Sequence, residues 1–129
     1  LGVGCKRGTG TETLAEAFAA FCAQNRLAPQ CITAAASIDL KQNETGLLTF
    51  CKSHGWPVQF FTAEQLRAAP GSFTPSAFVQ SVTGVDNVCE RSAVLAAGGT
   101  LVFHKYAHTG VTFALAVRPY APDWRWQNV

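Results

Sequence analysis

The sequence predicts a single three-layer α/β/α sandwich built on a mixed, mostly parallel sheet of about five strands. Two observations lead to this prediction. The 129 residues match one ordinary domain in length, and 48% of them are hydrophobic, which is enough for a core without disulfide or metal support. Short apolar runs alternate with helical patterns, and two such runs lie close together near the end. We expect one domain over residues 1–118 and an irregular tail over residues 119–129.

Five short apolar segments bounded by turn residues are expected to form the strands. They cover residues 2–5, 31–36, 58–61, 100–104 and 111–117. Helical patterns separate the first three segments, which favours parallel pairing, whereas a short loop joins the last two. Open α/β sheets bind ligands beyond the carboxyl ends of their strands. The loops after the first three strands are therefore the expected place for a site.

Capping signals mark where the expected helices begin. Capping-box patterns occur at residues 9–12, 62–65 and 87–90, and Thr74-Pro75 places proline at a first helical position. The apolar residues that follow the first of these signals recur at helical spacing. A further helix is expected over residues 45–54, with Gly55 at its end.

Composition argues against several classes of function. Basic residues are scattered singly apart from Lys6-Arg7, and the net charge is only +2, so we expect no nucleic-acid-binding surface. No apolar run approaches the roughly 18 residues of a membrane span. The five cysteines form no Cys-x-x-Cys pair, which favours free thiols in a reducing cytoplasm over a disulfide or zinc framework. We expect a cytoplasmic protein that holds no metal and no cofactor.

The leading candidate site is the turn formed by residues 2–9, Gly-Val-Gly-Cys-Lys-Arg-Gly-Thr. Its glycines allow a ligand to approach the backbone, and free N–H groups at the start of the next helix favour negative charge. Lys6 and Arg7 add positive donors at the same point. The predicted anion-binding residues are Gly4, Cys5, Lys6, Arg7, Gly8 and Thr9. A tight turn with two solvated charges is the plainer alternative.

Two nucleotide-binding motifs fit this turn poorly. In the dinucleotide pattern G-x-G-x-x-G the last glycine would come one residue before Gly8, and an acidic ribose partner is missing from residues 27–30. The P-loop requires a lysine between its last glycine and the following threonine, and Gly8-Thr9 lacks it. A nucleotide phosphate is therefore a weak candidate for the anion.

Candidate acid–base groups lie on other segments. Asp39 and Glu44 follow the second strand, and Glu90 belongs to a capping box. A solvated loop is the alternative for the first two residues, and helix capping is the alternative for Glu90. Cys5 lies beside Lys6 and Arg7, whose positive charges give a reason to expect a lowered thiol pKa, but no histidine is assignable as its partner. The histidines of residues 104–108 have a zinc-like spacing that requires a helix, whereas this stretch is expected to be strand and loop.

Four sequence blocks occur in the order typical of one family. They are G-x-G-C-K-R-G-T at residues 2–9, S-I-D-L-K-x-x-E-x-G-L at 37–47, S-V-T-G-V-x-x-V-C-E at 81–90 and G-V-T-F-A-L-A at 110–116. Together they resemble the family formed by CobE and the C-terminal domain of CbiG, of cobalamin biosynthesis. The resemblance covers residues 1–117.

This resemblance implies a role in building the corrin ring. CbiG-type proteins open a lactone on a cobalt-precorrin and release a two-carbon fragment as acetaldehyde, but they carry additional N-terminal regions. The chain by itself is therefore expected to bind a precorrin or corrinoid intermediate rather than to catalyse. Hydrolysis of a precorrin lactone is the alternative, with Asp39, Glu44 and Glu90 as candidate catalytic residues. Docking to another enzyme of the same pathway is a third hypothesis.

The resemblance also implies how such a ligand is held. Precorrins and corrinoids carry acetate and propionate carboxylates around a large apolar macrocycle. The turn at residues 4–9 suits one carboxylate, and Lys41 and Arg91 are expected to bind others. The macrocycle requires an apolar groove, for which Trp56 or Phe73 is proposed as the lining.

Overall fold

One five-stranded sheet runs through residues 1–118, the part of the chain that the computed structural model describes. The expected tail at residues 119–129 lies outside the described residues. The strands are β1 (Gly2–Gly4), β2 (Ala35–Ile38), β3 (Val58–Phe61), β4 (Thr100–His108) and β5 (Val111–Val117). The helices are α1 (Thr11–Asn25), α2 (Thr45–Ser53), α3 (Ala63–Arg67), α4 (Ala77–Thr83) and α5 (Cys89–Ala97), with single 3-10 turns η1 (Pro29–Cys31) and η2 (Asp39–Lys41).

The strand order is β3-β2-β1-β5-β4. β1 pairs with β2 and β2 with β3 in parallel, whereas β5 is antiparallel to both β1 and β4. The expected mixed sheet of five strands is thus confirmed, but the expectation of a mostly parallel sheet is corrected. The reason is a two-residue hairpin loop in which Thr109 and Gly110 both have positive φ, 52° and 79°. Such a loop reverses the chain tightly and sets β5 antiparallel to β4, and β5 also pairs antiparallel with β1, so half of the strand pairings are antiparallel.

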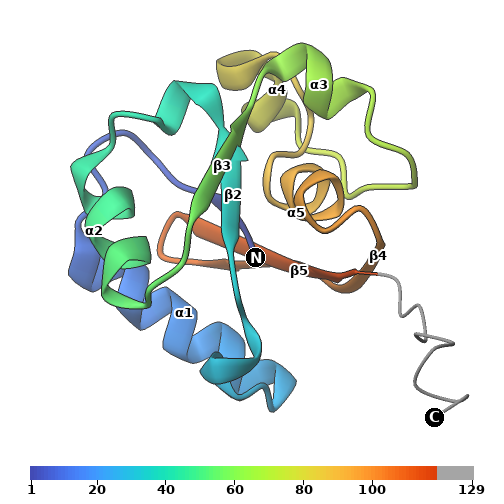
Figure 1. The fold of residues 1–129 in the computed structure, drawn as a ribbon. Helices are drawn as coiled ribbons and strands as arrows, with labels where there is room; N and C mark the ends of the chain where they lie inside the picture. Colours follow the sequence, from blue (N-terminus) through green and yellow to red (C-terminus); the bar gives the residue numbers. More distant parts are fainter. Residues whose placement is uncertain (119–129) are drawn as a thin grey trace, which may run out of the picture.

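Helices cover both faces of this sheet, as Figure 1 shows. α1 and α2 pack together on one face, where α1 also contacts β4 and β5. α5 crosses the other face and contacts all five strands, and α3 packs against α5. The core follows this division, with an aromatic cluster that includes Phe18, Phe50 and Phe113 on one side and an aliphatic cluster that includes Ile38 and Leu66 on the other. The sheet is thus the middle layer of three, and β4 and β5 contact α1 on one face and α5 on the other.

The helix starts match their capping signals in part. At α3 the Thr62 side chain and the Gln65 side chain form the full capping box that was expected. At α1 the expected box is absent, because Gly10 is the N-cap and the Thr9 hydroxyl donates instead to the Lys6 carbonyl. The prediction that the Thr9 side chain caps α1 was therefore wrong.

Three further element boundaries differ from expectation, one of which is the end of the fourth strand, which continues to His108 rather than ending at residue 104. The second strand begins at Ala35 rather than at residue 31, because residues 29–31 form the 3-10 turn η1. α4 begins after Ser76, whose hydroxyl accepts a hydrogen bond from the Val79 N–H, and not at Thr74-Pro75. Thr74 is instead bonded to Glu90, which keeps the segment before α4 out of the helix.

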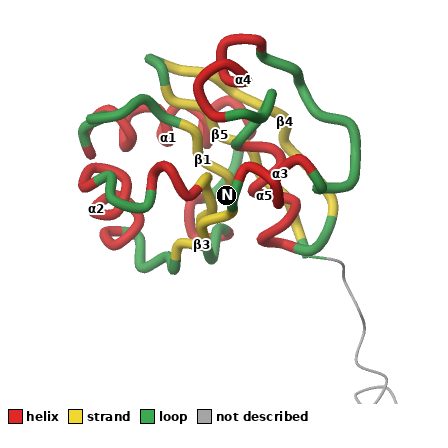
Figure 2. Tube along the Cα trace, turned by 90° about the horizontal axis from the view of Figure 1, so that it is seen from above, coloured by secondary structure: helices red, strands yellow, loops and turns green. Residues whose placement is uncertain are grey.

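The view in Figure 2 looks down on the molecule from above and shows α4 beside the ends of the strands rather than on a face of the sheet. No buried residue lies in this helix.

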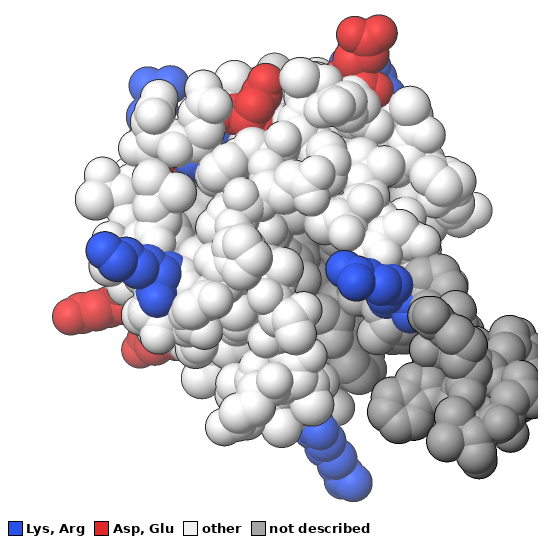
Figure 3. All heavy atoms as spheres, viewed as in Figure 1, with Lys and Arg blue, Asp and Glu red and all other residues white. Residues whose placement is uncertain are grey.

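Charged residues are sparse and scattered on the face in Figure 3. No helix among the described residues is both long enough and apolar enough to cross a bilayer.

Candidate functional site

A cavity of about 810 Å³ opens at the carboxyl ends of β1 and β2. This volume lies within the range of ordinary ligand sites, about 300–1,000 Å³. Its lining comes from five segments: residues 4–7 at the end of β1, residues 37, 38, 40, 41, 43 and 44 at the end of β2 and beyond it, residues 76, 78, 79, 82 and 83 around α4, residues 87–89 at the start of α5, and residues 105, 107, 110 and 112 of the β4–β5 hairpin. The expected loops after the first two strands are brought together here, whereas the segment directly after β3 is absent from the lining.

The turn after β1 is fastened to the loop before α2. The Thr9 N–H and hydroxyl both donate to the Lys6 carbonyl, at 3.2 and 2.7 Å. The Gly8 N–H donates to Oε1 of Glu44 at 2.8 Å. Gly4, Cys5, Lys6 and Arg7 line the cavity, whereas Gly8 and Thr9 lie outside its lining. The cavity is therefore reached by the first half of the turn and not by the start of α1.

Four basic residues surround the cavity: Lys6, Arg7, Lys41 and Lys105. Among the described residues, no carboxylate forms an ion pair with any of them. Glu44 is the single acidic residue in the lining. Since four positive charges from several elements converge around one carboxylate and form no ion pair with it, the cavity favours a ligand that carries more than one negative charge.

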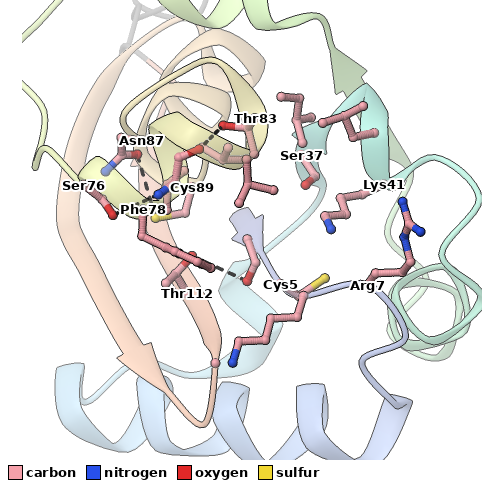
Figure 4. A pocket seen from close by; sticks show the side chains of 18 of the residues that line it. Cys5, Arg7, Ser37, Lys41, Ser76, Phe78, Thr83, Asn87, Cys89 and Thr112 are labelled. Atoms are coloured by element: carbon pink, nitrogen blue, oxygen red, sulfur yellow. Dashed lines mark hydrogen bonds between the residues drawn. The ribbon is translucent and has the colours of Figure 1, made fainter.

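These basic residues come from different sides. Figure 4 shows Arg7 and Lys41 on one side of the hollow, with Asn87, Cys89 and Thr112 across from them. Lys105 belongs to β4. Lys105 could not be predicted from the sequence, because it lies about a hundred residues from the turn and no local pattern links the two.

Arg91 is placed away from the cavity lining. Its guanidinium forms an ion pair with Asp86 at 2.9 Å, donates to the Leu66 carbonyl at 3.1 Å, and lies 4.6 Å from the centroid of the Phe73 ring. Phe73 is thus covered by this cation and does not line the groove. Trp56 is buried in the aromatic core, where its Nε1–H donates to the Ile32 carbonyl. The apolar lining is supplied instead by Leu40, Phe78, Val79 and Val82.

Glu90 is fully buried at the start of α5. Its carboxylate accepts hydrogen bonds from the Thr74 N–H at 2.7 Å, the Lys105 N–H at 2.7 Å and the Asn87 amide at 3.0 Å. Burial by itself raises the pKa of this carboxyl group, but hydrogen bonds from Thr74 and Lys105 and the nearby His104 outweigh burial and lower the pKa. The ionised carboxylate thus links three segments: the segment before α4 through Thr74, the start of α5 through Asn87, and β4 through Lys105.

Half of the expected capping box is present at α5. Oδ1 of Asn87 accepts the Glu90 N–H at 2.8 Å, as predicted. The Glu90 side chain does not return to the Asn87 backbone, because Thr74 and Lys105 occupy it.

Asp39, the other acid–base candidate outside the turn, is not part of the cavity lining.

The two histidines lie four residues apart on the extended strand β4, which separates them too far to share a metal ion, and each has a different partner. Nδ1 of His104 lies 3.5 Å from a Glu90 oxygen, and Nδ1 of His108 lies 2.9 Å from the hydroxyl of Thr109. Within residues 1–118, no three His, Cys, Asp or Glu side chains are grouped closely enough to hold a metal ion.

The environment of Cys5 corrects the expectation of a lowered pKa. Burial raises the pKa of this thiol, and the positive charge of Lys41 opposes that effect only in part. Cys31 is the exposed cysteine of the described set. Adjacent basic residues in the sequence therefore do not make Cys5 a reactive thiolate.

At pH 7.5 iodoacetamide is expected to modify Cys31 at least about tenfold faster than Cys5, because the thiolate of Cys5 is disfavoured by burial. Peptide mass spectrometry after short labelling times measures both rates on the same sample. A Cys5 rate equal to that of Cys31 would contradict the raised pKa.

Comparisons with known proteins agree on one family. The family model "Cobalamin synthesis G C-terminus" matches residues 1–116. The chain is 34% identical over 116 residues to the cobalt-precorrin-5A hydrolase of Salmonella typhimurium, covering 90% of this chain and 33% of that protein. It therefore spans about a third of the length of that relative.

Shorter relatives match over more of their length. Protein CobE of Sinorhizobium sp is 30% identical over 119 residues, which cover 90% of this chain and 77% of that protein. A crystal structure of CobE, a protein from the cobalamin biosynthetic pathway, superposes with a TM-score of 0.79 at 29% identity, over 88% of this chain and 84% of that one.

Proposed function

This chain belongs to the family of CobE and the C-terminal domain of CbiG, of cobalamin biosynthesis, and from this premise we propose that it binds a precorrin or corrinoid intermediate through the carboxylates of the ring. The observation that carries the proposal is the set of four basic residues, free of ion pairs within the described chain, around one cavity. A ring with acetate and propionate side chains presents carboxylates in several directions at once. Cations on separate elements suit such a rim better than a single phosphate.

The position of the turn also favours a ring carboxylate over a nucleotide phosphate. A phosphate site of the P-loop or dinucleotide kind uses the backbone N–H groups at a helix N-terminus. Here Gly8 and Thr9 lie outside the lining, and the Gly8 N–H already donates to Glu44. Charged side chains, rather than backbone amides, are what the cavity offers to an anion.

The acid–base candidates favour binding over hydrolysis. Glu90 is enclosed by hydrogen bonds, Glu44 accepts one from the turn, and Asp39 is outside the lining. A general acid or base must reach the proton that it transfers. The hydrolases of the family are about three times as long as the matched segment, so their reaction is not transferred to this chain.

The test is a titration of the purified chain with a cobalt corrin that carries free side-chain carboxylates, followed by its visible spectrum. Lys41→Ala and Arg7→Ala are each expected to weaken binding by at least about tenfold, since a charge-assisted hydrogen bond contributes about 1.5–3 kcal/mol. Added salt should weaken binding further. Lys52→Ala serves as the matched control, because Lys52 is exposed on α2 and outside the cavity.

The same titration with a ring whose carboxylates are replaced by amides separates the contribution of the carboxylate charges from that of the rest of the ring. We expect the amidated ring to bind more weakly than the carboxylate ring and to be insensitive to Lys41→Ala. Equal affinity for both rings would overturn recognition through carboxylates. Release of acetaldehyde from a lactone-bearing precorrin would favour hydrolysis instead.

A further inference from the structure

Large apolar side chains are exposed at the cavity to an unusual degree. The three most exposed among the described residues are Phe78, Leu40 and Val82, which are 69%, 60% and 59% exposed, and all three line the cavity. The less exposed Val102 and Leu48 lie outside its lining. An apolar surface gathered at one cavity, rather than scattered singly, is typical of a binding site.

The helix that carries two of these side chains has an uncommon position in the fold. α4 has seven residues and buries none of them. A short helix without a buried face gains little stability from packing, although packing is what ordinarily maintains a helix of this length. Its apolar face is therefore available to a ligand.

Both ends of α4 are nevertheless fixed. Before the helix, the Thr74 N–H and hydroxyl are bonded to the buried Glu90. After the helix, the Gly84 carbonyl accepts a hydrogen bond from the Arg67 guanidinium at 3.0 Å. The helix is thus held over the cavity by its two ends and by Val79, which packs against the aliphatic cluster, whereas Phe78 and Val82 remain exposed.

We infer that α4 is the element that recognises the apolar face of the ring, with Phe78 and Val82 packing against the macrocycle and Leu40 of η2 extending the same contact. This inference rests on the proposed function and assigns a second part of the ligand to a second part of the cavity. The basic residues Lys6, Arg7 and Lys41 bind the carboxylate rim, and α4 binds the flat apolar surface that this rim surrounds.

The kind of ligand that fits the cavity follows from its two linings, one of basic residues and one of exposed apolar side chains. A purely anionic ligand would leave Phe78 and Val82 in water, and a purely apolar one would desolvate unpaired cations at a large cost. A flat apolar body with several carboxylates at its edge satisfies both linings. Burial of a phenylalanine side chain against such a body contributes enough to change affinity by about tenfold or more.

The experiment uses the carboxylate corrin and the amidated corrin with a Phe78→Ser variant. We expect this substitution to weaken binding of both rings by a similar factor of about ten, because it removes a contact to the macrocycle and not to its charges. Val82→Ser should act in the same direction with a smaller factor. Lys41→Ala should weaken only the carboxylate ring, so the two substitutions separate the two parts of the site.

Val102→Ser is the matched control, since Val102 is 43% exposed on β4 and outside the cavity lining. Hydrogen exchange supplies a second readout, in which ring binding is expected to slow exchange of the α4 amides. If the unchanged chain binds neither ring, the proposed function fails. If the chain binds the rings but Phe78→Ser leaves both affinities unchanged, or alters only the oligomeric state in light scattering, the assignment of α4 is overturned while the proposed function stands.

Discussion

Glu90→Gln is expected to lower the free energy of unfolding by about 3 kcal/mol. In the native chain Oε1 of Glu90 accepts from the Thr74 N–H and the Asn87 amide, and Oε2 accepts from the Lys105 N–H and the Thr74 hydroxyl. Glutamine keeps one acceptor oxygen and turns an NH₂ donor toward the donors on the other side. Because the site is fully buried, no water replaces the lost acceptor.

Urea unfolding of the two proteins at pH 7 measures this difference. Glu16→Gln is the control, because Glu16 is exposed on α1 and its replacement should change stability by less than about 0.5 kcal/mol. A loss of less than about 1 kcal/mol for Glu90→Gln would show that the hydrogen bonds of Glu90 are easily replaced.

The pH dependence of the same pair has a definite sign. Burial opposes ionisation of Glu90, but the hydrogen bonds from Thr74 and Lys105 prevail and its pKa is lowered in the folded chain. A lowered carboxyl pKa stabilises the fold above the pKa of the unfolded state, and this contribution is lost as the pH falls through the folded pKa. The stability gap between the native chain and Glu90→Gln should therefore be widest near neutral pH and narrow in acid.

The effect of Glu90 extends to the site because of what it holds. Thr74 precedes α4, and Lys105 and Asn87 line the cavity. We expect Glu90→Gln to weaken ring binding even in buffer where the variant is folded. We therefore propose that the Glu90 carboxylate is a positioning residue rather than the general acid or base that its sequence context left open.

Local patterns in the sequence were sufficient to predict much of the fold. Strand and helix alternation over the first half depends on neighbouring residues, so β1, β3 and α2 lie close to their expected bounds. The antiparallel insertion of β5 beside β1 was not predicted, because Gly2 and Ala114 pair across more than a hundred residues. No periodicity within either segment specifies that partner.

The site shows the same division between local and distant information. Lys6 and Arg7 were visible as adjacent charges, the family resemblance implied Lys41, and all three line the cavity. Lys105 was missed, since a single lysine in a strand carries no local signal. The direction of the Cys5 pKa was wrong because adjacent charges can be seen in a sequence but burial by distant segments cannot.

α4 illustrates a limit of amphipathic patterns. Ala77, Phe78 and Val82 form an apolar face in the sequence, and such a face ordinarily packs on the core. In this fold the face lines a cavity, with Phe78 69% exposed. The pattern identifies a helix with an apolar face, but it does not distinguish a core partner from a ligand.

Gly2→Ala is expected to destabilise the fold by about 3 kcal/mol or more. A Cβ atom on Gly2 would lie 1.7 Å from the carbonyl oxygen of Cys89 and 2.7 Å from its carbonyl carbon. Both atoms belong to the backbone in the first turn of α5, so no side-chain rotation relieves the clash. Either β1 leaves its place in the sheet or α5 moves away from it.

Gly10→Ala is the matched control, because a Cβ at Gly10 meets no atom within 4 Å and Gly10 has an ordinary φ of −76°. Loss of glycine at this N-cap should cost less than about 1 kcal/mol. Thermal and urea unfolding of both variants compare the two positions directly. Similar midpoints for the two would contradict the close approach of α5 to β1.

The same contact links the packing of the sheet to the cavity. Val88 and Cys89 line the cavity at the start of α5, so an α5 displaced by Gly2→Ala carries one wall of the site with it. We therefore expect the folded fraction of Gly2→Ala to bind the carboxylate ring more weakly, although Gly2 is not part of the lining. Gly10→Ala also removes a glycine near the turn, but it crowds no neighbour. If this control binds the ring normally, the weaker binding of Gly2→Ala is caused by the displaced wall of the cavity and not by reduced backbone freedom.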